Sequence, residues 1–479
     1  MQNLGLIGDS DTRTLNKARF RFGKIQTGIY LQSKLDKSGN TYTVPVLLKL
    51  IGYDTKLLNQ SLDSLLTRHR ILRIKPISAE EFEIIPKDKI IPVIMSLNES
   101  EVSDYLESAA NKVFDIDKDI LITPQIVVIE NSKADSLNYV ILNLTHHHLL
   151  TDAYSIDMII GEVINGYHQL KLTGFIPDLP VTLDYIDYIP YQEYLVASDE
   201  YMQVCNILAN RLSQVSYLHI PTKKADNGYE NFGEQFNLTI SQEIITKLNE
   251  LALDCKVSLY TILLTLLYHV LNQFNQNHEE LFTIGITVSN RKPEFNHALG
   301  PFISFLPLIF DYSKTESILE NFLRVHQELT LLTEHSDINL TQITQVMPAS
   351  VRNVAIIDSQ ESKALIQVMF TMHNFEQSGQ DVTWISLKRN VEKFGISIIA
   401  KQREEGLVLE VSYMLDKYSK EIIEKIFGCY LEALNDVNSC QLDESISNLR
   451  LITDEDYQKL VINWNETDED YELNKTIHG

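Results

Sequence analysis

Three consecutive histidines, His146, His147 and His148, are followed four residues later by Asp152. Histidine suits proton transfer near pH 7, because its unperturbed pKa lies close to neutrality. The run 140–144 before them is mostly apolar, with β-branched residues and neither Gly nor Pro, which predicts a buried strand. A rigid strand that ends in titratable residues is a common way to hold a catalytic group in place.

The residues after the histidines predict a helix. Ser155 is a residue type favoured at the N-cap, so we expect a helix over 156–170 that stops at Gly174. The three histidines do not predict a metal site, because adjacent residues cannot easily converge on one ion. Elsewhere, Cys and His residues show no metal-ligand spacing, and the four cysteines show no disulfide framework.

Composition limits the class of protein. The chain has 479 residues, enough for two ordinary domains or for two large halves that share a site. Apolar residues make up 44% and charged residues 22%, as in a globular protein with a full core. The net charge of −24 argues against a nucleic-acid partner, since phosphate binding needs clustered Lys and Arg. Four thiols in so long a chain fit the reducing cytoplasm.

The sequence lacks the signals typical of secreted proteins, membrane-spanning proteins, nucleotide hydrolases and serine hydrolases. The N-terminal stretch contains no apolar run of signal-peptide length. The most apolar run, 259–271, is too short to cross a bilayer and predicts a buried core helix, so we expect no membrane partner. The sequence has neither a Walker phosphate loop nor a Gly-x-Ser-x-Gly elbow, which argues against nucleotide hydrolysis and serine-hydrolase chemistry.

From His147 the chain reads His-His-Leu-Leu-Thr-Asp-Ala, which resembles the His-His-x-x-x-Asp-Gly motif of the condensation domains of nonribosomal peptide synthetases. The same motif marks the wider chloramphenicol-acetyltransferase-like acyltransferase superfamily. Ala153 stands where the family usually has Gly. Further segments resemble other family signatures and occur in the family's order: Gln26 with Ile29 and Tyr30, then residues 68–73, 184–188, 289–291, 299–308, 335–337, 365–370 with Asn374, and 464–467.

This resemblance implies an α/β fold, a pseudo-dimer of two chloramphenicol-acetyltransferase-like subdomains arranged in a V shape, with the active site between them. Residues 1–178 would form the N-terminal subdomain with the histidine motif, and residues 179–455 the C-terminal subdomain. A Pro-spaced stretch around residue 178 marks the boundary. Residues 456–479 resemble the linker toward a following adenylation domain.

The resemblance also implies a reaction. A condensation domain forms an amide bond between a donor acyl thioester and the amine of an aminoacyl acceptor, each bound to a carrier protein. The implied partners are an upstream donor and a downstream acceptor peptidyl carrier protein, and the adjacent adenylation domain. The phosphopantetheine arms belong to the carriers, so the chain should need no cofactor of its own and no metal.

Within the motif, the resemblance makes the second histidine, His148, the catalytic one, either as a general base or as a hydrogen-bond donor to the tetrahedral intermediate. His147 and Asp152 complete the motif. His147 is expected to be a structural neighbour, because adjacent strand residues point to opposite faces. Asp152 is expected to hold its loop through an ion pair, since a desolvated carboxylate needs a partner.

Arg291 is the preferred partner of Asp152, because its planar guanidinium can bind a carboxylate bidentately. Arg68 and Arg73 are the alternatives from the first half. The resemblance further places four residues along the substrate tunnel: Tyr185, Asp187, Ser304 and Gln367.

Three other readings stay open. Within the superfamily, the chain could be a starter-type enzyme that takes a fatty-acyl donor, or an enzyme that forms an ester. A non-catalytic recruitment module is a reading from another class, with Ala153 and the pair Ser304-Phe305 as marks of lost activity. Heterocyclisation is disfavoured, since the family's heterocyclisation domains have Asp in place of the first motif histidine, here His147.

Overall fold

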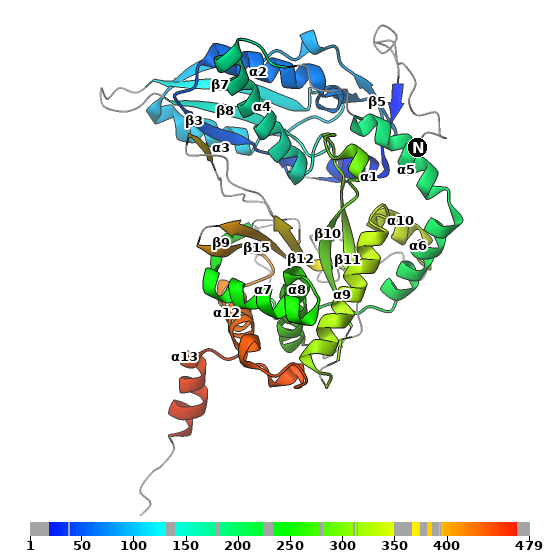
Figure 1. Ribbon diagram of the computed structural model, residues 1–479, viewed down its shortest axis with the longest axis vertical. Helices are drawn as coiled ribbons and strands as arrows, with labels where there is room; N and C mark the ends of the chain where they lie inside the picture. The colour runs from blue at the N-terminus through cyan, green and yellow to red at the C-terminus, as the bar shows by residue number, and fades with distance from the viewer. Residues whose placement is uncertain are drawn as a thin grey trace, which may run out of the picture.

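The structure is a computed structural model. It describes residues 19–36, 39–130, 139–177, 183–223, 233–276, 281–309, 312–313, 315–348, 366–373, 381–385, 392, 394–403 and 405–466. Two halves, each built on one large sheet with helices, lie one above the other in Figure 1. The expected boundary at residue 178, Asn374 and the last part of the 456–479 linker lie outside the described residues.

The first half contains a sheet with the strand order β13-β3-β8-β7-β6. Its strands are β3 (Leu47–Ile51), β6 (Val93–Asn98), β7 (Ile122–Glu130), β8 (Tyr139–His147) and β13 (Val382–Trp384), and β2 (Thr43–Val44) pairs with the end of β8. Strand β8 lies between β3 and β7, and every one of its residues is buried. The buried strand predicted from the apolar run 140–144 is therefore confirmed.

The two faces of this sheet carry different helices because side chains alternate along a strand. Leu142 packs in one cluster with α2 (Thr55–Arg68) and α4 (Ala153–Thr173), whereas Ile141 packs in another with α3 (Val102–Ala110). A small separate sheet consists of β1 (Arg19–Arg21), β5 (Glu81–Ile84) and β4 (Ile74–Pro76). Helix α1 (Lys24–Leu35) follows β1.

The second half contains a sheet with the strand order β11-β10-β12-β14-β15-β9. Its strands are β9 (Gly233–Ser241), β10 (Thr283–Ser289), β11 (Ile303–Leu308), β12 (Ile366–His373), β14 (Ile396–Arg403) and β15 (Gly406–Met414). Its helices are α7 (Gln242–Cys255), α8 (Leu259–Phe274), α9 (Ile318–Glu334) and α12 (Lys420–Asp436). In Figure 1 helices α7, α8 and α12 lie below this sheet, so its other face is turned toward the first half.

Helix α8 forms the centre of the second core. All its residues from Thr261 to Asn272 are buried, which confirms the buried helix predicted for the run 259–271. Among the described residues no single helix is both long enough and apolar enough to cross a bilayer. Helices α7 and α8 together meet that length and composition, with a bend of 102° between them.

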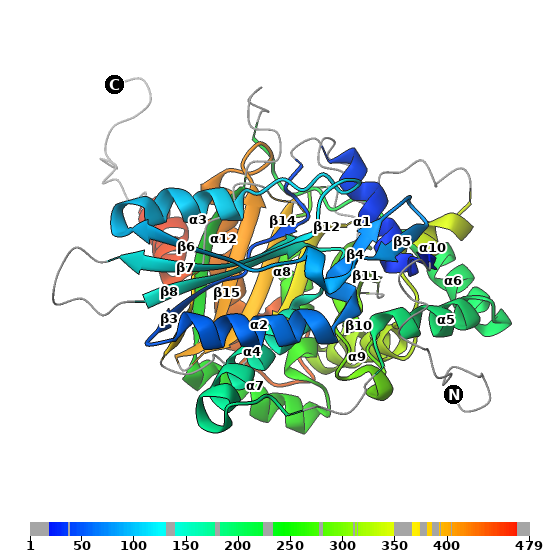
Figure 2. The same cartoon turned by 90° about the horizontal axis from the view of Figure 1, so that it is seen from above.

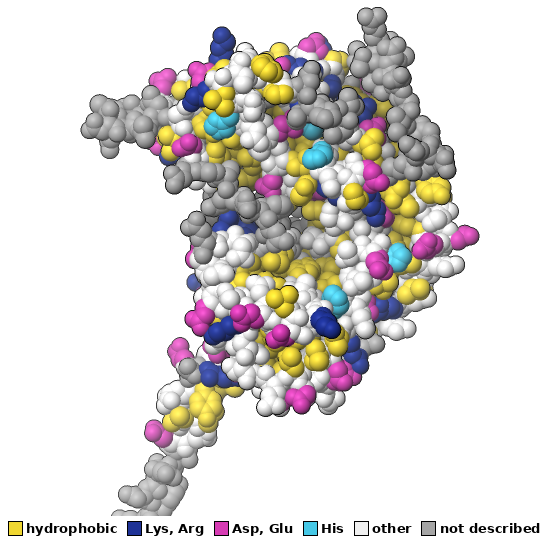
Figure 3. All heavy atoms as spheres, viewed as in Figure 1, with side chains coloured by type: hydrophobic (Ala, Val, Ile, Leu, Met, Phe, Trp, Pro, Cys, Tyr) yellow, Lys and Arg dark blue, Asp and Glu magenta, His cyan; other side chains and the backbone are white. Residues whose placement is uncertain are grey.

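The halves are joined along one side by α5 (Tyr185–Val196) and α6 (Asp199–Leu212), with α10 (Leu340–Val346) beside them, as Figures 1 and 2 show. On the opposite side, β13 leaves the second half and pairs with β3 of the first sheet. No local pattern in the sequence predicts this exchange. The space-filling view shows a recess between the halves (Figure 3).

Helix α4 begins earlier than predicted. Asp152 is its N-cap and accepts a hydrogen bond from the Ser155 N–H, so the prediction that Ser155 caps the helix is wrong. Asp and Ser are both favoured at the N-cap. Here Asp152 caps the helix, and the Ser155 hydroxyl instead bonds to the second half, as described below. Gly174 ends the helix with φ +80°, as predicted. After α12, the chain continues into α13 (Asp454–Tyr457), which points away from both halves (Figure 1).

Candidate active site

His148 is the first residue after β8 and lies on a turn. Its backbone N–H donates to the Tyr42 carbonyl oxygen at 2.8 Å, which extends the pairing of β2 with β8 by one residue. Its side chain is half-buried, whereas the His146 and His147 side chains are buried. Of the three histidines, His148 is therefore the one that solvent or a substrate can reach.

His147 is held in one tautomer by its two neighbours. The Leu149 N–H donates to Nδ1 at 3.1 Å, so the ring proton must be on Nε2, which lies 3.0 Å from the Ser33 Oγ. Burial lowers the pKa of His147 to about 3. The ring is neutral at pH 7 and both of its nitrogens are bonded to groups of this chain, so a structural role for His147 stays the prediction.

His146 holds the opposite tautomer. Its Nδ1–H donates to the Leu144 carbonyl oxygen at 2.7 Å, and its Nε2 accepts from the Thr151 hydroxyl. Burial lowers the pKa of His146 to about 4, so this ring is neutral as well. We call residues 146–152 the histidine turn. Its two buried histidines stabilise the turn by accepting hydrogen bonds from the Leu149 N–H and from the Thr151 hydroxyl.

Asp152 ends the histidine turn and forms the expected ion pair with Arg291. The Arg291 Nη2 lies 3.3 Å from the Asp152 Oδ1, and the two side chains are 5% and 1% exposed, respectively. The Asp152 carboxylate also accepts from two backbone N–H groups, of Ser155 at 2.8 Å and of Phe302 at 3.0 Å. Its buried charge is thus fully compensated by one cation and two amides.

The segment 290–302, which we call the arginine loop, contains Arg291 and so provides the second member of the ion pair with Asp152. Arg291 donates from Nη1 to the carbonyl oxygens of Phe295 (3.2 Å) and Ala298, and from Nη2 to the Ser155 Oγ at 3.0 Å. Its guanidinium carbon lies 4.2 Å from the centroid of the Phe302 ring. Burial lowers the pKa of Arg291, and the neighbouring Asp152 opposes this shift.

Ser155 is a site residue whose role the sequence analysis missed. Its hydroxyl donates to the Gly300 carbonyl oxygen at 2.9 Å and accepts from the Gly300 N–H at 3.0 Å and from Arg291. Gly300 also lies so close to the Tyr185 ring that a Cβ there would clash with it. A serine in the first turn of a helix signals a cap, and nothing local indicated a contact with residue 300.

Ala153 is the first residue of α4 and has an ordinary negative φ, since Lys256 is the one described non-glycine residue with a positive φ. Arg68 does not reach Asp152. Its Nη1 pairs with Glu162 of α4 at 2.6 Å, and Arg73 donates to the Ile85 carbonyl oxygen. The alternative partners for Asp152 are therefore excluded, and Arg68 fastens α2 to α4 instead.

Two of the four expected tunnel residues lie in the first turn of α5. Tyr185 is fully buried, and its ring packs edge-on against Phe302 with 4.9 Å between the centroids. Asp187 accepts from the Asp184 N–H at 2.8 Å and from Arg70 at 3.0 Å, which caps the start of α5. Both side chains join α5 to its neighbours, so a substrate contact for either stays a prediction.

The other two expected tunnel residues lie on the second sheet. The Ser304 Oγ accepts from the Asn290 amide at 3.0 Å, so this serine supports the arginine loop. Gln367 is 7% exposed, and its Oε1 accepts from the Tyr418 hydroxyl at 3.4 Å. Ser304 and Gln367 stand on β11 and β12, which β10 separates. The tunnel itself stays a prediction.

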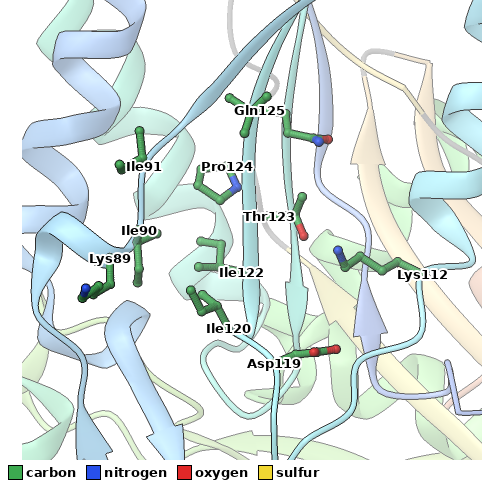
Figure 4. A pocket seen from close by; sticks show the side chains of 11 residues that line it. Lys89, Ile90, Ile91, Lys112, Asp119, Ile120, Ile122, Thr123, Pro124 and Gln125 are labelled. Carbon is green, nitrogen blue, oxygen red and sulfur yellow. The ribbon is translucent and has the colours of Figure 1, made fainter.

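A pocket of about 370 Å³ lies on the first half, and His148 is not among the residues that line it (Figure 4). Residues before β6 and at the start of β7 line it, among them Ile90, Ile91, Ile122 and Pro124, with Lys112 at its rim. Among the described residues, no three His, Cys, Asp or Glu side chains converge to hold a metal ion.

Two α/β halves with a histidine motif at the end of a buried strand define a fold of the chloramphenicol-acetyltransferase-like class. The family model described as "Condensation domain" matches residues 20–461. The chain therefore belongs to the condensation-domain family, as the motif and the ordered signatures suggest.

Curated relatives include large peptide synthases. The chain is 21% identical over 473 residues to bacitracin synthase 3 of Bacillus licheniformis, covering 96% of this chain and 7% of the relative. It is 23% identical to tyrocidine synthase 2 of Brevibacillus parabrevis, covering 96% of this chain and 13% of that protein. The chain thus corresponds to a small part of these relatives.

Solved structures share the fold at low sequence identity. The X-domain from teicoplanin biosynthesis superposes with a TM-score of 0.76 and 16% identity, covering 93% of this chain and all of the other. A four-domain nonribosomal peptide synthetase bound to AMP and glycine superposes with a TM-score of 0.75 and 19% identity over 91% of this chain and 34% of the other. The expected α/β pseudo-dimer is thereby confirmed.

Proposed function

We propose that this chain is an active condensation domain, an acyltransferase that forms an amide bond in nonribosomal peptide biosynthesis. The observation that carries the proposal is the position of His148. It is the one reachable histidine of the motif, on a turn fixed to a fully buried strand and tied through Asp152 to the other half.

In the proposed reaction, the amine of the acceptor attacks the carbonyl carbon of the donor thioester. A C–N bond forms, the C–S bond breaks, and the departing thiolate takes up the proton that the amine loses. Holding the two substrates in line contributes an effective molarity of about 10⁵–10⁸ M. His148 either accepts the amine proton, worth about 10²–10⁴-fold, or donates a hydrogen bond to the tetrahedral intermediate.

The other motif residues support His148 without contacting substrate. His147 is neutral and buried, and Asp152 is neutralised by Arg291. The substrates would arrive on phosphopantetheine arms of an upstream donor carrier and a downstream acceptor carrier. An adenylation domain would load the acceptor, and the reaction would take place in the cytoplasm.

The test is a condensation assay with a loaded donor carrier and a loaded acceptor carrier, scored by intact-protein mass spectrometry. We expect product with the unmodified chain, and a loss of about 10²–10⁴-fold for His148→Ala. The matched control is His326→Ala on α9, a half-buried histidine far along the chain from the motif, which should leave the rate unchanged. Retention of activity within about threefold by His148→Ala, below the general-base range, would refute the assignment.

Varying the substrates separates the close alternatives. A hydroxyacyl acceptor that reacts faster than its aminoacyl counterpart would indicate ester formation. A fatty-acyl thioester preferred over every aminoacyl donor would indicate a starter-type enzyme.

A non-catalytic recruitment module is the second candidate. It is favoured by the X-domain of teicoplanin biosynthesis, a neighbour of the same fold that has been solved in a complex with OxyB. If no pair of loaded carriers yields product while the chain binds another protein of the same biosynthetic system, recruitment is the better conclusion.

A further inference from the structure

We infer that helix α1 sets the position of His148, and that Gln26 and Ser33 are the positioning residues through which it acts. The inference rests on the proposed function of His148. Gln26 and Ser33 are seven residues apart, so they lie on the same face of α1, two turns from each other. That face is turned toward the histidine turn, because both side chains bond to it.

Gln26 connects α1 directly to the residue after His148. Its side chain is fully buried, and its Nε2 donates to the Leu149 carbonyl oxygen at 3.2 Å. Its Oε1 accepts from the Gly23 N–H at 3.3 Å, which fixes the amide orientation. Burial of an amide side chain costs free energy unless its oxygen and its nitrogen are both hydrogen-bonded. Here the oxygen bonds to the N-cap residue of α1, and the nitrogen bonds to the histidine turn.

Ser33 acts on the same residue through His147. The Ser33 Oγ accepts a hydrogen bond from the His147 Nε2–H, and Nδ1, which carries no proton, accepts from the Leu149 N–H. Without an acceptor at Nε2, only the Leu149 N–H favours this tautomer, so the preference for it is weaker. The other tautomer would place an N–H against the Leu149 N–H, two donors facing each other.

Helix α1 therefore controls both backbone groups of Leu149, the carbonyl through Gln26 and the N–H through Ser33 and His147. The Tyr42 carbonyl oxygen holds the His148 N–H from the other side. The backbone that carries the catalytic ring is thus fixed on both sides of His148. Neither Gln26 nor Ser33 needs to touch a substrate for this to matter.

The predicted consequence is a loss of kcat with little change in KM. Gln26→Leu keeps the approximate volume of the side chain but removes both hydrogen bonds, and we expect kcat to fall up to about 10²-fold, the cost of a misplaced catalytic group. Ser33→Ala should lower kcat less, by about tenfold, as one indirect bond is lost. Ser33→Thr keeps the hydroxyl and should restore most of the rate.

Two matched controls separate positioning from general packing. Gln192 is a buried glutamine whose Oε1 accepts from the Lys24 N–H of α1 without a bond to the histidine turn. Ser61 is a buried serine whose Oγ donates to the Val163 carbonyl oxygen, between α2 and α4. Gln192→Leu and Ser61→Ala should lower the melting temperature but leave kcat close to that of the unmodified chain.

Two measurements test the contacts without relying on turnover. Amide hydrogen exchange should show faster exchange at Leu149 in both Gln26→Leu and Ser33→Ala than in either control. NMR of ¹⁵N-labelled histidines should show the Nε2-protonated tautomer of His147 in the unmodified chain and a mixture in Ser33→Ala.

The outcomes distinguish the inference from the proposed function. If the unmodified chain forms product and both variants keep kcat within about threefold, below any general-base effect, the inference is wrong and the function stands. If the unmodified chain forms no product, the function fails. Unchanged Leu149 exchange together with an unchanged His147 tautomer would then overturn the inference as well, and altered exchange would uphold the contacts.

Discussion

The histidine turn and the arginine loop meet at Asp152, but they are held in different ways. The histidine turn is fastened by neutral hydrogen bonds within the first half, to α1, β2 and its own backbone. The arginine loop is fastened by a buried charge and by Ser155 across the two halves. The first arrangement fixes one side chain, and the second fixes the halves relative to each other.

The difference follows from what each contact has to do. A neutral network is short-ranged and directional, so it can place a ring accurately. A buried ion pair is strong only while both members are present, so it makes the two halves depend on each other. We therefore expect changes at His148 and at its contacts with α1 to act mainly on catalysis, and changes at Asp152 to act mainly on folding.

Asp152→Ala should have the largest effect on stability. Among the described residues it removes the carboxylate partner of the buried Arg291, together with the cap of α4 and the acceptor for the Phe302 N–H. Loss of one member of a buried pair costs about 3–5 kcal/mol, so we expect poorly soluble or unfolded protein. Melting temperature and soluble yield measure this.

The matched control is Glu243→Ala, which breaks the solvent-exposed pair with Lys247 on α7. Such pairs contribute about 0–1 kcal/mol, so this variant should fold. A soluble Asp152→Ala protein with an unchanged melting temperature would contradict the structural role of Asp152.

Acid should destabilise the chain through the histidine turn. Burial lowers the pKa of His146 to about 4 and of His147 to about 3, below the unfolded value of 6.5. The unfolded chain therefore binds more protons between pH 6.5 and those values, and stability is lost as pH falls through this range. Each histidine should contribute a slope of about 1.4 kcal/mol per pH unit.

Urea unfolding at several pH values between 7 and 5 measures this slope. His147→Gln removes one titrating ring, so the slope should decrease by about 1.4 kcal/mol per pH unit. An equally steep slope in His147→Gln would mean that this ring is not the buried neutral group that the contacts indicate.

Some features of the fold and the site can be predicted from the sequence, and others cannot. The buried strand, the motif and helix α8 were found because apolar periodicity and a short motif are local signals. The Asp152–Arg291 pair was found because a buried carboxylate needs a cation, and few arginines stand in a suitable place.

What was missed depends on pairings between distant segments. Ser155 binds Gly300, and Gln26 binds Leu149, more than a hundred residues apart in both cases. The exchange of β13 into the first sheet is a contact of the same kind. The packing of Tyr185 against Phe302 is a further contact between distant segments. Local pattern carries no information on such contacts.

Ala153→Gly tests whether the departure from the family motif limits activity. Ala153 is already helical, so glycine gives no relief of backbone strain and should cost about 0.5–1 kcal/mol of stability. Removing the methyl group should preserve or raise the condensation rate. A large loss of activity in the same assay would show that the methyl group has a specific function.

The smallest effect should come from Asp157→Asn, on α4 beside the ion pair. Burial and the neighbouring Asp152 raise the pKa of Asp157 to about 6, above its unfolded value of 3.8. The folded state thus binds the proton more tightly, so stability falls as pH rises from 3.8 to about 6 and stays lower above it.

Asparagine removes that charge, and we expect a slightly higher melting temperature at pH 8 and little difference at pH 5, where the native carboxyl is mostly protonated. Because the group is partly exposed, solvent screening keeps the gain small. An identical difference at the two pH values would show that the gain is not electrostatic, and a lower melting temperature at pH 8 would show that the Asp157 carboxylate has a stabilising partner.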